Sequence, residues 1–161
     1  MGTDMSNMTD LKIEREVVID APVDAVWRTV TEPDQISQWF ADRVELDATP
    51  GGAGVFIFHN EEGKAIHTAT LVVEAVEPPT RFSFRWCHPE GAVPVSDNSI
   101  LVEFTLRPDG GERTRLRVAE SGLDLVAWPE DDKVRYAEEH RKGWANFVDR
   151  LAGLLADCPA G

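Results

Sequence analysis

The chain has 161 residues and a formal net charge of −13, from 29 acidic against 16 basic side chains, and 42% of its residues are apolar. This length and apolar content suit one domain with a hydrophobic core and exclude a disordered chain. The excess of acidic groups would repel phosphate backbones and anionic lipid, so we expect neither nucleic acid nor a membrane as a partner.

The N-terminal third predicts a short tail, one strand and two short helices. Residues 1–10 are polar and are expected to form a disordered tail, followed by a single domain over residues 11–157. Apolar and polar residues alternate from Lys12 to Asp20, as in a half-buried strand. Pro22 then favours a helix start, and Pro33 breaks this helix and opens a second one that reaches Phe40.

The middle of the chain, residues 43–120, reads as six further strands separated by turns. Glycine- or proline-containing turns at residues 50–54, 61–64, 78–79 and 108–111 separate runs in which apolar residues alternate. Short hairpin connections imply antiparallel pairing. We therefore expect an antiparallel sheet of seven strands in total.

The C-terminal segment, Asp131 to Asp157, predicts one long helix that packs on this sheet. Pro129 precedes it, and acidic residues fill its first turn, where the helix dipole favours them. Its length of about 25 residues and its wide apolar stripe require a long partner surface, which indicates an α+β fold of two layers. The stripe consists of Val134, Ala137, His140, Arg141, Trp144, Phe147, Val148, Leu151, Leu154 and Leu155.

Several motifs in this order resemble one known family over about residues 11 to 156. They are Ala-Pro-Val-Asp-Ala-Val-Trp (21–27), Trp39-Phe40, Pro-Gly-Gly (50–52), Trp-Cys-His-Pro (86–89), Thr-Arg-Leu (114–116) with Glu-Ser-Gly (120–122), and His-Arg-Lys-Gly-Trp (140–144). The chain is similar to bacterial proteins related to the activator of Hsp90 ATPase, in the START/Bet v 1-like (SRPBCC) superfamily. The resemblance implies a helix-grip fold, in which a curved seven-stranded antiparallel sheet grips the C-terminal helix around a hydrophobic cavity.

The candidate ligand-binding residues are those expected between the helix stripe and the inner face of the sheet. If side chains fill this gap, the site is a plain core; if they leave it open, they line an apolar pocket with a few polar groups. His67, His88 and Glu120 share the inward parity of their strands and His140 lies on the helix stripe, so each either contacts a ligand or is satisfied by solvent or backbone. The candidates are Trp39, Phe56, Phe84, Trp86, Phe104 and Trp144 as aromatic walls, with His88, Glu120 and His140 as polar anchors.

Three functions remain open at this point. The leading hypothesis is a cytoplasmic protein that binds a hydrophobic small molecule. The second is a co-chaperone or stress-response protein that works through its surface, and the third is a cyclase- or dehydratase-like enzyme with a pocket His or Glu as proton carrier. No catalytic residue is assigned, because nothing in the sequence pairs a nucleophile with a base, and no cofactor is assigned either. No metal ion is expected, because Cys87, Cys158 and the scattered His and Glu residues show no ligand spacing. A homodimer is suggested by the habit of the superfamily.

Overall fold

The structure is a computed structural model that describes residues 11–87 and 92–157. The expected tail at residues 1–10 and the candidate His88 lie outside these residues. The elements follow the predicted order of one strand, two short helices, six strands and one long helix. They are β1 (Ile13–Ile19), α2 (Val23–Thr31), α3 (Pro33–Ile36), β2 (Arg43–Leu46), β3 (Ala53–His59), β4 (Ala65–Glu77), β5 (Arg81–Trp86), β6 (Ile100–Pro108), β7 (Thr114–Ser121) and α4 (Glu130–Asp157).

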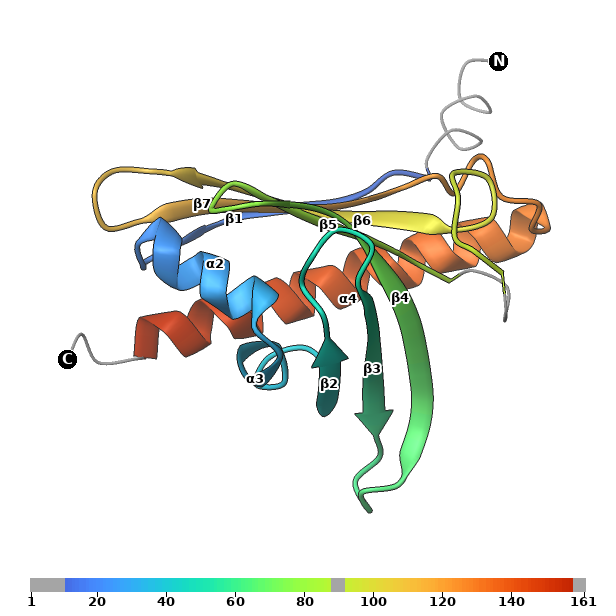
Figure 1. The fold of residues 1–161 in the computed structure, drawn as a ribbon, viewed down its shortest axis with the longest axis horizontal. Helices are drawn as coiled ribbons and strands as arrows, with labels where there is room; N and C mark the ends of the chain where they lie inside the picture. Colours follow the sequence, from blue (N-terminus) through green and yellow to red (C-terminus); the bar gives the residue numbers. More distant parts are fainter. Residues whose placement is uncertain (1–10, 88–91, 158–161) are drawn as a thin grey trace.

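The strands form one antiparallel sheet in the order β1-β7-β6-β5-β4-β3-β2. Only β1 lies out of sequence order, because the two short helices carry the chain from one edge of the sheet to the other. Figure 1 shows that the sheet curves, so that β2, β3 and the far end of β4 turn away from the plane of the other strands. The α4 helix runs along the concave face (Figure 1). The predicted helix-grip α+β fold is therefore confirmed.

The buried face of α4 repeats every three or four residues. Ala137, Trp144, Val148 and Leu151 are all buried, as expected for a helix with one apolar stripe. The prediction was wrong at the N-terminal end of the helix, where Val134 is 43% exposed. The covered face of α4 at this end passes through Lys133, the preceding residue, which is 7% exposed, and on to Ala137.

The Pro-Gly-Gly turn between β2 and β3 depends on both of its glycines. Gly51 has a φ of +85°, a left-handed conformation that side chains disfavour. A Cβ atom on Gly52 would lie 2.1 Å from the carbonyl oxygen of Asp47. Neither position tolerates a side chain without a change in the turn.

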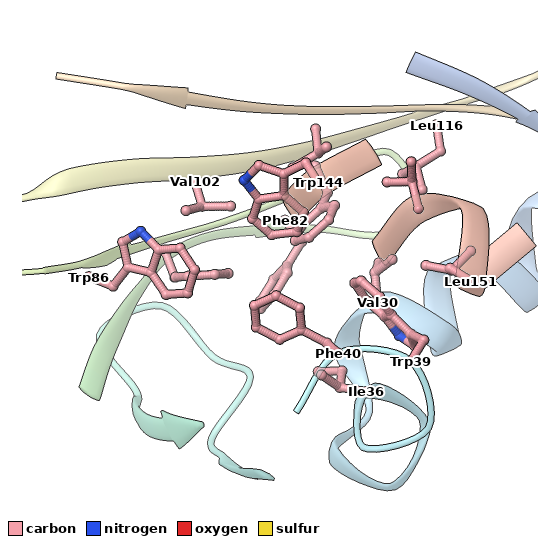
Figure 2. Close-up of a cluster of buried hydrophobic side chains, with 14 of the residues drawn as sticks. Val30, Ile36, Trp39, Phe40, Phe82, Trp86, Val102, Leu116, Trp144 and Leu151 are labelled. Carbon is pink, nitrogen blue, oxygen red and sulfur yellow. The ribbon is translucent and has the colours of Figure 1, made fainter. Parts of the chain in front are cut away.

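The hydrophobic core lies between the sheet, α4 and the pair α2–α3. Figure 2 shows its side chains arriving from all of these elements. Inward residues alternate along β6 and β7, as predicted, and from Ile100 to Leu106 and from Thr114 to Glu120 they are at most 5% exposed. In the strands β5 to β7 they include Phe82, Phe84, Val102, Phe104, Leu106, Leu116 and Val118.

Within the described residues, no helix combines the length and the low charge that a membrane span requires.

Candidate functional site

Glu120 is a carboxylate on the inner face of the sheet. It continues the inward row of β7 after Thr114, Leu116 and Val118, all of which are fully buried. Its side chain has no exposed surface. Burying a carboxylate in an apolar interior is costly unless several donors replace its water, so its partners define the site.

Four side chains surround the two oxygens of this carboxylate. Tyr136 Oη donates to Oε1 over 2.5 Å, and Trp86 Nε1 donates to the same atom over 3.2 Å. Trp144 Nε1 donates to Oε2 over 2.6 Å, and His140 Nδ1 lies 2.6 Å from Oε2. An ionised carboxylate only accepts hydrogen bonds and has about four acceptor sites. This set of partners therefore matches its full capacity.

The helix explains how three of these partners meet. Tyr136, His140 and Trp144 follow each other at four-residue steps on α4, which places them on one face of the helix. The imidazole of His140 stacks on the ring of Tyr136 with 3.7 Å between centroids. Trp86, at the end of β5, supplies the fourth partner from the sheet. The cluster thus joins the helix to the sheet through one buried charge.

Burial and the negative charge of Glu120 raise the pKa of Tyr136 far above its ordinary value. Tyr136 therefore stays protonated and remains a donor to Glu120. The neighbouring Cys87 is an exposed residue as a whole. Its sulfur, however, points inward and lies 3.6 Å from Tyr136 Oη. Burial of this sulfur, with a smaller contribution from the charge of Glu120, raises the pKa of Cys87 to about 11.

Beside this cluster, α4 and the β3–β4 hairpin enclose a partly open cavity of about 260 Å³. We call it the aromatic cleft, since five of its nine lining residues are Phe or Trp. Trp86, His140 and Trp144 separate it from Glu120, and the helical Gly143 leaves room where another residue would project. Its lining is Phe40, Phe58, His67, Trp86, Glu139, His140, Gly143, Trp144 and Phe147.

A second space lies deeper, between α2–α3, the sheet and α4, and holds only about 10 Å³. We call this region the packed interior. It is lined by Val30, Ile36, Trp39, Phe40, Phe56, Phe82, Phe84, Phe104 and Trp144. Phe40 and Trp144 line both spaces and stack with 5.4 Å between ring centroids. These two rings form the wall between cleft and interior.

The predicted ligand-binding residues therefore fall into separate places. Trp86, His140 and Trp144 line the cleft, with Glu120 behind them. The other described candidates, Trp39, Phe56, Phe84 and Phe104, line the packed interior. Trp39 has its indole N–H bonded to the carbonyl oxygen of Thr29 at 2.9 Å.

The list of candidate residues did not include the rest of the cleft lining, although His67 and Phe147 were expected on inward faces. Phe58 and His67 share the far end of the β3–β4 hairpin, where their rings lie 5.7 Å apart. His67 is exposed, although its strand parity predicted an inward position. The end of the hairpin reaches beyond the helix. Residues on the inward face of the strands therefore border the mouth of the cleft at this point and are not buried in the core. The spacing of Phe147 on the α4 stripe was visible in the sequence, but nothing marked Gly143.

Among the described residues, no group of three or more His, Cys, Asp or Glu side chains is arranged to hold a metal ion. The site is thus an aromatic cleft with histidine at its wall and mouth and a buried carboxylate behind it. Such an arrangement can enclose an apolar molecule and offer it a hydrogen bond.

Comparison with known proteins gives one family. The model of the activator of Hsp90 ATPase homolog 1-like protein family matches residues 20–156, which is most of the chain. No curated protein sequence matches significantly.

Solved structures of similar proteins show the same fold. The protein MLL2253 from Mesorhizobium loti is 25% identical, with a TM-score of 0.72 over 92% of this chain and 98% of that one. DynU16, described as a putative protein in the dynemicin biosynthetic locus, is 30% identical, with a TM-score of 0.70 over 92% of this chain and 48% of that one. The Aha1 dimer from Colwellia psychrerythraea is 17% identical, with a TM-score of 0.67 over 89% of this chain and 95% of that one.

Proposed function

The chain belongs to the activator of Hsp90 ATPase homolog 1-like family, and from that premise we propose that it binds an apolar small molecule in the aromatic cleft. The observation that carries the proposal is a cavity of about 260 Å³ with five aromatic side chains in its lining. Ligand sites are concave and mostly apolar, with a few polar groups that fix orientation. The volume is near the lower end of the usual range of about 300–1,000 Å³, which favours a compact ligand of one or two rings.

The packing behind the cleft supports this use. Phe40 contacts Phe147 at 4.7 Å and Phe58 at 5.5 Å between ring centroids, so the cleft has a firm aromatic floor. Trp86 and Trp144 are fixed through their indole N–H groups to Glu120. Walls that are already ordered lose little side-chain entropy when a ligand binds. The cleft is therefore suited to binding without rearrangement.

The other two hypotheses have less support. The large apolar side chains exposed on the surface, Val18, Ile66, Val93, Val95, Leu125 and Val134, come from different segments of the chain, and the co-chaperone hypothesis rests on the family description. A cyclase- or dehydratase-like reaction needs an acid and a base that both reach the substrate. Glu120 is sealed behind the cleft wall and cannot be one of them.

Two helical glycines allow a matched test. A Cβ atom on Gly143 would meet only Phe147 Cε2, at 3.9 Å, so a larger side chain can enter the cleft without a backbone clash. Gly153, on the same helix, has nothing within 4 Å and does not line the cleft. Replacing either glycine by leucine should slightly stabilise the helix, since glycine lowers helix stability by about 1 kcal/mol relative to alanine.

The experiment measures binding of the neutral, environment-sensitive naphthalene dye prodan. We expect the wild type and Gly153→Leu to bind it with similar affinity, and Gly143→Leu to bind at least tenfold more weakly while remaining folded by circular dichroism. Equal dye binding by Gly143→Leu and the wild type, or no binding by the wild type, would overturn the proposal.

A further inference from the structure

The imidazole of His140 is held in one orientation and one tautomer by Glu120. Nδ1 lies 2.6 Å from Glu120 Oε2, while Tyr136 and the two indoles donate to the same carboxylate. A carboxylate with three other donors acts as an acceptor toward the fourth group. The ring hydrogen of neutral His140 therefore resides on Nδ1, where it is donated to Glu120.

Nε2 of His140 then carries a free lone pair. The two ring nitrogens point to opposite sides of an imidazole, so Nε2 faces away from the buried carboxylate. His140 lines the cleft and its side chain is 27% exposed. Among the described residues, none donates a hydrogen bond to Nε2. The ring thus presents a hydrogen-bond acceptor on the cleft side.

The other polar groups of the cleft add to this bias. The indole N–H groups of Trp86 and Trp144 are turned toward Glu120, so these walls offer ring faces and no donor. Glu139, the only carboxylate in the lining, is an acceptor when ionised. Together with the formal net charge of −13, this disfavours an anionic ligand. A ligand whose polar group is a donor would be satisfied at His140, whereas one with only acceptors would find its single side-chain donor in His67, at the exposed mouth of the cleft.

We propose that the cleft selects aromatic molecules that carry a hydroxyl group, and that His140 Nε2 accepts the hydrogen bond from this hydroxyl. The inference rests on the proposed function, because it names the ligand class of the same cleft. Glu120 takes no part in contact with the ligand; it is a positioning residue that fixes the imidazole.

The test compares 1-naphthol with its methyl ether, 1-methoxynaphthalene, which has the same ring system but no hydroxyl donor. The ether is the more apolar of the two, so burial alone would favour it. We expect the wild type to bind 1-naphthol at least tenfold more tightly than the ether. In His140→Phe, which keeps a ring in place, this preference should disappear, while affinity for the ether is retained.

His67→Phe is the matched control, since it alters the other histidine of the same cleft. It should keep the tenfold preference. If the wild type binds both compounds equally or prefers the ether, the hydroxyl inference is overturned while the cleft remains a binding site. If it binds neither, both proposals are overturned. Retention of the preference in His140→Phe, or its loss in His67→Phe alone, also contradicts the role of His140.

A second measurement does not depend on the folding of a variant. In the ¹⁵N spectrum of the wild-type imidazoles, 1-naphthol should shift the His140 Nε2 resonance more than Nδ1, whereas the ether should leave Nε2 unchanged. An unchanged Nε2 resonance at saturating 1-naphthol overturns the inference.

Discussion

The aromatic cleft and the packed interior lie on either side of the same two rings, Phe40 and Trp144, yet they differ in content. The interior retains about 10 Å³ and is lined only by apolar and aromatic residues. The cleft retains about 260 Å³, and its lining includes His67, Glu139 and His140. Both are built from α4 and the sheet, so the fold alone does not determine which region stays open.

The difference comes from the short helices and from one buried charge. Residues of α2, α3 and the turn after them, such as Val30, Ile36 and Trp39, fill the space between helix and sheet at one end. The lining of the cleft contains no residue of α2 or α3, and Glu120 holds the side chains of Trp86, His140 and Trp144 in place. The position of a cavity in this fold is thus set by what the connecting helices cover.

Truncating Phe40, which separates the two regions, should have the largest effect on stability. Phe40→Ala truncates a side chain that is 8% exposed and lies against six aromatic rings. We expect a loss of about 3–5 kcal/mol in the free energy of unfolding, measured by urea denaturation. The same variant should join the cleft to the interior and accept ligands larger than prodan.

Phe58→Ala is the control for this prediction. Phe58 is half-buried and lines only the cleft, so we expect a loss of about 1–2 kcal/mol and no gain in ligand size. Equal destabilisation by the two substitutions would mean that Phe40 does not separate two different regions.

Neutralising the buried carboxylate should have the next largest effect. Glu120→Gln replaces an acceptor oxygen by an NH₂ group, which must face donors, so at least one buried donor loses its partner. We expect the free energy of unfolding to fall by about 1–3 kcal/mol. Glu103→Gln on the neighbouring strand removes a carboxylate bonded to Arg81 on the solvent side, and should change stability by less than about 1 kcal/mol. A larger loss in Glu103→Gln than in Glu120→Gln would contradict the account.

The smallest effect concerns reactivity and leaves the fold unchanged. Because burial and Glu120 raise the pKa of Cys87 to about 11, little of the reactive thiolate is present at neutral pH. In a Cys158→Ser background, the rate of alkylation of Cys87 by iodoacetamide should rise with pH in the folded chain, with a midpoint at about 11. The urea-unfolded chain should show the ordinary midpoint of about 8.5. Coincident pH profiles would show that the sulfur is not in the environment described.

Much of the fold could be predicted from the sequence, because alternation along strands and the stripe of α4 are local signals. The alternation of β6 and β7 places Phe104 and Val118 inward, as found. These signals failed at two positions: Val134 is exposed while Lys133 beside it is buried, and His67 is exposed because the hairpin end reaches beyond the helix. Burial there depends on how far the opposing layer reaches, which local sequence does not encode.

The candidate site was less accessible to sequence reasoning. Inward parity correctly pointed to Glu120 as a buried charge, and the resemblance to a helix-grip family pointed to a cavity. Which aromatic residues would line open space could not be deduced, because Trp39 and Trp86 both lie next to apolar and polar residues in the sequence. Their difference arises from packing, since α3 brings Trp39 into the interior while Trp86 borders the cleft.

The most direct test of the central claim follows the five indole N–H resonances during titration with prodan. Binding in the cleft should shift the signals of Trp86 and Trp144, whose rings line it, and leave that of Trp39 in place, since its N–H is bonded to Thr29 in the packed interior. A shift of Trp39 equal to those of Trp86 and Trp144, or no indole shift at saturation, would contradict the account.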